Sequence, residues 1–178
     1  MVPPDTRYGV RITSTAPVIV QPTRGEYSPR DPVTEAMASF VAYPGPLGAR
    51  ETRWAYADGL ILDSDEPLEE REWITILNPH ANRDATVAIV LLSNDGRRTQ
   101  TLVVPGERVR SLDLAGLAAV PKNVPFGVVV ESDVPVVVEQ VRRAYRKGTP
   151  TTVSMFACLA QPIGGAPDAP TSGSDPEQ

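Results

Sequence analysis

One segment of the chain is repeated, and the distance between its two copies constrains the whole fold. Residues 8–44 align without a gap on residues 126–162 at a fixed offset of 118, and 13 of the 37 aligned positions are identical. Solenoid and propeller repeats have periods of about 20 to 50 residues, so the repeated unit here is a whole domain. We therefore predict that residues 1–48 are the C-terminal part of a preceding unit and that residues 49–165 form one complete unit. Residues 166–178, rich in Pro, Ser and Asp, are expected to be a disordered tail.

The periodicity within the complete unit is that of β-strands. Six short segments rich in Val, Ile and Thr are separated by turn signals such as Asn94-Asp95-Gly96. They predict an all-β fold, an antiparallel β-sandwich or barrel of about seven or eight strands, and only residues 111–120 are compatible with a short helix. Three extra N-terminal strands should dock on this domain or on another copy of the chain. The six segments are 74–77, 85–92, 99–105, 127–132, 135–141 and 152–160, and the N-terminal strands are expected near 9–14, 17–22 and 37–43.

Composition narrows the class of protein. An apolar fraction of 41 % supports a buried core, while a net charge of -5 argues against nonspecific binding to nucleic acid or anionic lipid. Cys158 is the only cysteine, so no intramolecular disulfide can form, and a reducing compartment is favoured. We expect no signal peptide, and no apolar run approaches the roughly 20 residues of a membrane helix. We expect a cytoplasmic protein without membrane insertion.

Side chains that commonly carry catalysis are scarce. His80 is the only histidine and is expected in an exposed loop, while Cys158 lies in an apolar strand where an inert thiol is favoured. Zinc, iron and copper sites need several His or Cys ligands, and no nucleophile elbow or phosphate-binding Gly-rich loop occurs. The sequence therefore predicts a noncatalytic protein, not an enzyme, with no metal and no cofactor.

Two charged clusters have simple explanations. The acidic stretch 63–72 could attract calcium, but it lacks the spacing and the glycine of a calcium loop, so a solvated loop is favoured. The basic stretch 142–147 contains Tyr145 and could contact phosphates, although a solvated turn is the more common outcome. Nucleic-acid binding is therefore not expected.

A third group of residues suggests a ligand. Strand alternation puts Trp54 and Tyr56 on one face, and it puts Glu72 and Asn78 on one face while Trp73 points away as the expected core residue. An aromatic face beside a carboxylate and the guanidinium of Arg142 suits neutral polar ligands such as sugars. The competing interpretation is that Trp54 is also a core or interface aromatic and that Arg142 pairs with Glu72 or Glu139.

The order of three motifs resembles the sensory rhodopsin transducer family. Its pattern W-A-x-A-[ED]-G is matched by residues 54–59, E-x-x-x-I-L-N by residues 72–78, and S-x-x-P-[IV]-V-V-x-x-x-R by residues 132–142. The resemblance implies a small all-β sandwich without enzymatic activity, self-association and a signalling partner, which for the type member is a membrane photoreceptor. It also implies that related domains bind small molecules, with Trp54, Glu72, Asn78 and Arg142 as ligand residues. The partial N-terminal unit and the acidic loop before Glu72 depart from the family pattern.

Two hypotheses about function follow. The first is a noncatalytic small-molecule-binding or signal-transducing β-sandwich protein, with a small polar ligand such as a sugar, a signalling protein partner and homo-oligomers. The alternative is a structural or assembly protein whose N-terminal partial unit pairs with a neighbouring chain.

Overall fold

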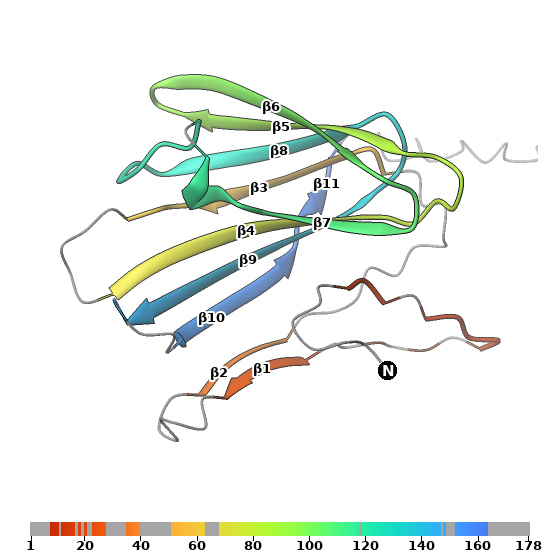
Figure 1. Ribbon diagram of the computed structural model, residues 1–178, viewed down its shortest axis with the longest axis horizontal. Coiled ribbons are helices and arrows are strands. Elements are labelled where there is room, and N and C mark those ends of the chain that lie inside the picture. The colour runs from red at the N-terminus through yellow and green to blue at the C-terminus, as the bar shows by residue number, and fades with distance from the viewer. Residues whose placement is uncertain are drawn as a thin grey trace, which may run out of the picture.

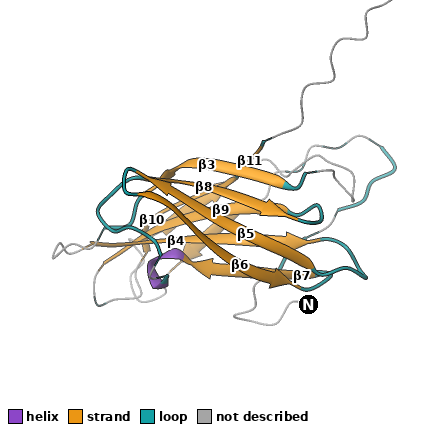
Figure 2. Cartoon of the chain, turned by 90° about the horizontal axis from the view of Figure 1, so that it is seen from above, coloured by secondary structure: helices purple, strands orange, loops and turns teal. Residues whose placement is uncertain are grey.

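A computed structural model shows two antiparallel sheets packed face to face, with a separate two-stranded hairpin beside them (Figures 1 and 2). The four-stranded sheet has the order β10-β9-β4-β7, and the five-stranded sheet has the order β11-β3-β8-β5-β6. The expected all-β sandwich is confirmed. The structure describes residues 8–10, 12–16, 18, 20, 23–27, 35–39, 51–62, 68–117, 119–146, 148 and 152–163.

The sandwich contains nine strands, and each of the six segments expected from sequence overlaps one of them. The β5–β6 hairpin closes at Asn94-Asp95, and Gly96 takes a φ of 112° that suits glycine at this turn. The strands are β3 (Arg53–Gly59), β4 (Leu68–Asn78), β5 (Ala85–Ser93), β6 (Gly96–Val104), β7 (Arg108–Asp113), β8 (Phe126–Ser132), β9 (Val137–Arg146), β10 (Thr152–Leu159) and β11 (Gln161–Pro162).

The segment expected to contain a helix is divided between a strand and one helical turn. Residues 111–113 end β7, which pairs with β4, and a single 3-10 turn, η1, follows at Leu114–Gly116. Asp113 caps this turn, because its side chain accepts a hydrogen bond from the Ala115 amide at 3.0 Å. Strand β7 was not predicted, since its sequence RVRSLD has charged residues at three of six positions.

The inner faces of the two sheets form the main core, and alternation along the strands decides which residues enter it. Ile74 and Ile76 of β4 are fully buried there, together with Trp54 of β3. Trp73 points to the outer face of the four-stranded sheet, where it forms a second small cluster with Val141 and Ala157. Trp73 is therefore buried in a core cluster as expected, but this cluster is the small outer one, and the main core uses Trp54.

The N-terminal strands differ in position from those expected. β1 (Thr23–Tyr27) and β2 (Glu35–Ser39) pair with each other as a hairpin, and β2 overlaps the third expected strand. In the segments 9–14 and 17–22, the residues that the structure describes lie outside any strand. The expected tail, 166–178, lies outside the described residues.

Candidate functional site

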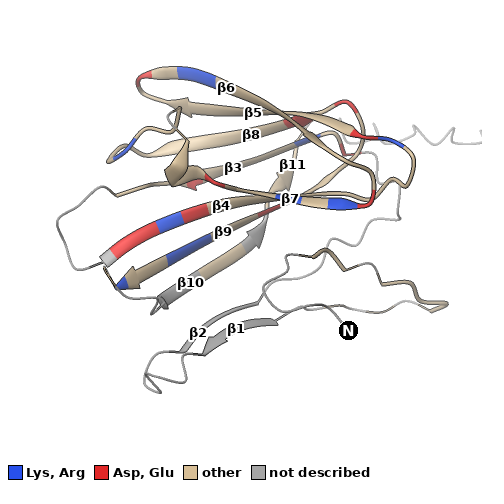
Figure 3. Cartoon of the chain, viewed as in Figure 1, with Lys and Arg blue, Asp and Glu red and all other residues tan. Residues whose placement is uncertain are grey.

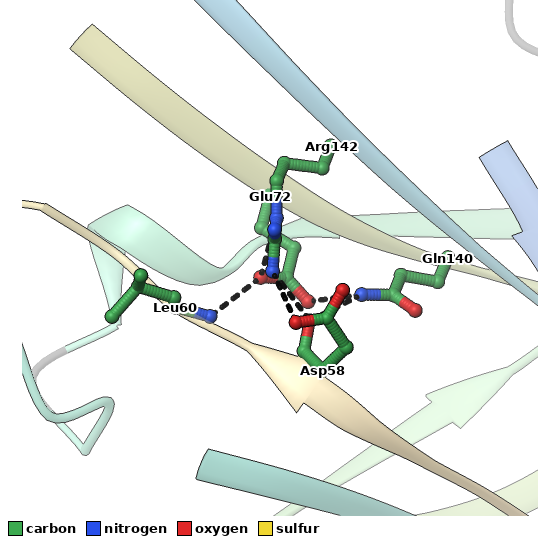
Figure 4. A network of polar contacts seen from close by, with 5 residues as sticks. All are labelled: Asp58, Leu60, Glu72, Gln140 and Arg142. Atoms are coloured by element: carbon green, nitrogen blue, oxygen red, sulfur yellow. Dashed lines mark hydrogen bonds and ion pairs between the residues drawn. The ribbon is translucent and has the colours of Figure 1, made fainter. Parts of the chain in front are cut away.

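A polar network joins the two sheets near one end of the sandwich (Figure 4). Asp58 comes from β3 of the five-stranded sheet, while Glu72 of β4 and Gln140 and Arg142 of β9 come from the four-stranded sheet. Glu72 and Arg142 are paired in the β4–β9 register, and Gln140, two residues before Arg142, lies on the same face of β9. The network therefore forms where alternation directs polar side chains into the space between the sheets.

Glu72 is the buried centre of this network, with no exposed surface. Its Oε1 accepts a hydrogen bond from Gln140 Nε2 at 2.8 Å, and its Oε2 accepts one from the Leu60 amide at 3.3 Å. Desolvation raises the pKa of Glu72, while hydrogen bonding from Tyr56 and the charge of Arg142 oppose that rise. Burial has the larger effect, so proton binding to Glu72 is favoured relative to an exposed glutamate.

Arg142 connects this buried carboxylate with the solvent. Its Nε lies 3.9 Å from Glu72 Oε2, and its Nη2 lies 3.3 Å from Asp58 Oδ1. Nη2 also donates a hydrogen bond to the Asp58 carbonyl oxygen. The Asp58 side chain is 80 % exposed and that of Arg142 is 21 % exposed. A polar molecule arriving from solvent can therefore reach Asp58 and part of the guanidinium.

An exposed aromatic residue stands in register with this arginine. Phe156 of β10 is the direct partner of Arg142 in the β9–β10 pairing, and it is 48 % exposed. Directly opposite residues on antiparallel strands share a face, so the ring and the guanidinium lie on the same side of the sheet. Guanidinium, carboxylate and an exposed ring are the groups that bind a polar molecule with one apolar face.

We call the exposed groups of Asp58, Arg142 and Phe156 the rim of this network. Two of the four residues that the family motif singles out lie apart from the rim. Trp54 is fully buried in the main core. Asn78 is fully buried at the other end of β4, six residues from Glu72, which corresponds to about 20 Å along a strand. Its Nδ2 donates to the carbonyls of Arg83 and Val104, and its Oδ1 accepts from the His80 amide at 3.1 Å. The structure thus brings Glu72 and Arg142 together, and Asn78 fixes the loop that follows β4.

Sequence reasoning missed Asp58, Gln140 and Phe156 as parts of the site. Gln140 could have been found, because it is two residues from Arg142 and so shares its face. Asp58 belongs to the W-A-x-A-[ED]-G motif, where its acidic character was a usable signal. Phe156 required the β9–β10 register, which the sequence does not show.

The basic stretch is divided between the two faces of β9. Arg142 points between the sheets, whereas the Arg143 guanidinium lies over the Trp73 ring at 5.3 Å on the outer face. Trp73 also packs edge-on against Tyr145, with ring centroids 6.3 Å apart. Figure 3 shows these charges of β9 beside the charged half of β4. Alternation therefore places the adjacent Arg142 and Arg143 on opposite faces of β9.

The remaining candidates for chemistry have structural partners or lie outside the described residues. His80 is half-buried, and its Nε2 lies 3.1 Å from the Pro135 carbonyl, so it is not the exposed loop histidine expected from sequence. Among the described residues there is no group of three or more His, Cys, Asp or Glu that could hold a metal ion. Residues 63–67 of the acidic stretch and the side chain of Cys158 are not described. In the same part of the chain, no helix is long and apolar enough to cross a membrane.

The fold and the buried network define a β-sandwich in which a Glu–Arg pair of the four-stranded sheet contacts Asp58 of the five-stranded sheet. Residues 48–159 match the model of the Anabaena sensory rhodopsin transducer family, so the chain belongs to that family and the resemblance seen in the sequence is confirmed. A solved Thermotoga maritima structure, titled "Crystal Structure of Thermotoga maritima 1070", is 22 % identical with a TM-score of 0.56. The match covers 66 % of this chain and 99 % of that one.

A second solved structure, the Anabaena sensory rhodopsin transducer, is 31 % identical with a TM-score of 0.43. The match covers 52 % of this chain and 95 % of that one. No curated protein matches the chain. The Thermotoga likeness is evidence for the fold alone.

Proposed function

We propose that this protein is a noncatalytic signalling module that binds a small polar ligand, such as a sugar, at the rim formed by Asp58, Arg142 and Phe156. Glu72 lies behind Arg142 and orients its guanidinium. The name of the Anabaena relative, a transducer, supports a role in signalling with a protein partner. A cytoplasmic location is part of this proposal and is supported by the single cysteine.

The observation that carries the proposal is the ion pair between the fully buried Glu72 and the partly exposed Arg142. A buried ion pair of this kind contributes little stability compared with apolar residues of the same volume, because both charges lose hydration. We infer that the Glu72–Arg142 pair serves recognition. A ligand hydroxyl can bind Arg142 and Asp58, and the resulting movement of Arg142 affects Glu72 and, through Asp58, the five-stranded sheet. Of the four motif residues, Arg142 belongs to the rim and Glu72 lies behind it, while Trp54 and Asn78 support the site from the core and the loop.

Ligand binding is tested by titration with neutral mono- and disaccharides while the melting temperature and tryptophan fluorescence are followed. The chain offers a matched pair of variants, since Arg142→Gln and Arg143→Gln change adjacent arginines on opposite faces of β9. We expect a sugar response in the wild type that is lost in Arg142→Gln and kept in Arg143→Gln. No response to any sugar, or equal loss in both variants, would contradict the proposal.

The assembly function is the second candidate, and one observation favours it. Cα atoms of β2 come within 8 Å of those of β10, the edge strand of the four-stranded sheet. The same hairpin on the β10 strand of a neighbour would link two chains and produce a homo-oligomer. Light scattering on the full chain gives its mass, and a mass that stays that of one chain at all concentrations would exclude this function.

A further inference from the structure

The β1–β2 hairpin has the strand register of the β9–β10 hairpin. In β1–β2, Thr23 faces Ser39 and Arg24 faces Ala38; in β9–β10, Val141 faces Ala157 and Arg142 faces Phe156. Adding 118 to both members of a β1–β2 pair gives the β9–β10 pair, and this also holds for Gly25–Met37 and Glu26–Ala36. Four consecutive pairs therefore agree, and they end where β9–β10 shifts register between Thr152 and Ser154.

The offset in register is the same as the offset of the sequence repeat. Within the two strands β1 and β2 the identical positions are Arg24 with Arg142, Tyr27 with Tyr145 and Met37 with Met155. Register depends on backbone pairing and turn geometry, so it is a separate observation from those identities. Both support the reading of residues 1–48 as the end of a preceding unit.

The β1–β2 hairpin lies beside β10, the strand to which β2 corresponds in the repeat. β10 pairs with β9 on one side only, and β2 lies along its other side (Figure 1), although β2 and β10 belong to separate sheets. Strand β2 corresponds to β10 in the repeat, so the strand that lies beside the edge of β10 is the counterpart of β10 itself. An uncovered edge strand presents unpaired backbone groups that bind another strand.

The N-terminal region also reaches the outer face of the same sheet. A Cβ added to Gly9 would lie 3.0 Å from Leu77 Cδ1 and 3.2 Å from Val109 Cγ2, so the backbone at Gly9 approaches β4 and β7 closely. The second cluster, around Trp73, lies on this face as well. The segment that precedes the complete unit is therefore in contact with the sheet both at its face and at its edge.

We propose that the edge of β10, together with the adjoining outer face, is a self-recognition surface whose partner is the β9–β10 hairpin of a second copy of this chain. In the intact chain, β1–β2 occupies this surface and prevents that contact. When β1–β2 is lost, the second copy offers a hairpin of the same register, and two chains associate. In this inference the hairpin covers the β10 edge of its own chain, so it is an alternative to the assembly role in which the hairpin binds a neighbour, and it does not depend on ligand binding.

The test breaks β1–β2 within the full chain. Successive N–H groups of a strand point to opposite sides, so Met37→Pro combined with Ala38→Pro removes a donor on both sides of β2. The control combines Thr171→Pro and Ser172→Pro, two adjacent positions outside the residues that match the family. Masses are measured by light scattering over a range of concentrations, and circular dichroism checks that the sandwich stays folded. A synthetic peptide of residues 20–42 is added to the hairpin variant as a competitor.

We expect the mass of the hairpin variant to be twice that of the wild type, the control to match the wild type, and the peptide to reverse the doubling. A hairpin variant with the mass of the wild type would overturn the inference. A hairpin variant with a lower mass than the wild type would also overturn it, because it would show that β1–β2 already binds a neighbouring chain in the wild type. If the variant does not fold, hydrogen exchange of the wild type with and without excess peptide replaces it. In that experiment we expect the β10 amides that face away from β9 to exchange slowly in the wild type, with or without peptide. Fast exchange of these amides would refute the inference that β1–β2 covers the edge of β10. Failure of sugar binding changes none of these outcomes.

Discussion

Removal of the buried carboxylate should cost far more stability than removal of an exposed one on the same strand. Glu72→Ala leaves two donors, Gln140 Nε2 and the Leu60 amide, without their acceptor, and each such buried donor costs about 1 to 3 kcal/mol. It also leaves Arg142 without its buried partner, and breaking a buried pair in this way costs about 3 to 5 kcal/mol in total. The matched control is Glu69→Ala, because the Arg71–Glu69 pair is about half exposed, with 45 % and 40 % of the two side chains accessible.

An exposed pair of that kind contributes about 0 to 1 kcal/mol, so the two variants should differ by at least about 2 kcal/mol. For a chain of this size, 1 kcal/mol corresponds to about 2 to 4 °C in melting temperature, so Glu72→Ala should melt about 6 to 20 °C below the wild type. Urea unfolding followed by tryptophan fluorescence and circular dichroism gives both free energies. If Glu72→Ala loses no more stability than Glu69→Ala, the network does not join the sheets as described.

Three further predictions concern pH, packing and the loop after β4. Because burial raises the pKa of Glu72, the folded chain binds this proton more tightly than the unfolded chain does. The free energy of unfolding should therefore fall as pH rises from the ordinary glutamate pKa towards the raised pKa. Glu72→Gln should remove this slope in urea titrations at several pH values, and an unchanged slope would assign it to other groups. Gly106→Ala places a Cβ 2.6 and 2.8 Å from two backbone carbonyls and should cost about 1 to 3 kcal/mol, whereas Gly116→Ala meets nothing within 4 Å and should be neutral in the same assay. Asn78→Ala leaves two carbonyls and one amide without its hydrogen bonds and should cost about 2 to 4 kcal/mol, while the exposed Asn82→Ala should change the melting temperature little; equal effects would remove Asn78 as the support of the loop.

The sequence predicted the sandwich because its short Val- and Ile-rich segments alternate with turn residues. It also predicted that Glu72 and Asn78 share a face opposite Trp73, which the structure confirms. It did not show which face enters the main core, because both faces of β4 carry large apolar residues: Ile74 and Ile76 on one, Trp73 and Leu77 on the other. The choice between them depends on which sheet packs opposite.

The candidate site could be predicted only in part. Strand alternation and side-chain chemistry singled out Glu72 and Arg142 before the family motif did, and their pairing was one of two alternatives considered for Arg142. Asp58 meets Arg142 across the sandwich from 84 residues away, and alternation within a strand carries no information about contacts between sheets. Strand rise alone separates Asn78 from Glu72 by about 20 Å, so that separation could have been found from the sequence.

The side chain of Arg142 offers the most direct test of the central claim, that the end of the Glu72 network is a ligand-binding rim. The Nε–Hε resonances of Arg142 and Arg143 can be assigned by nitrogen-15 NMR and followed while neutral sugars are added. We predict a saturable shift of the Arg142 resonance with little movement of Arg143. A shift confined to Arg143, or no saturable shift of Arg142 with any sugar, would contradict the account.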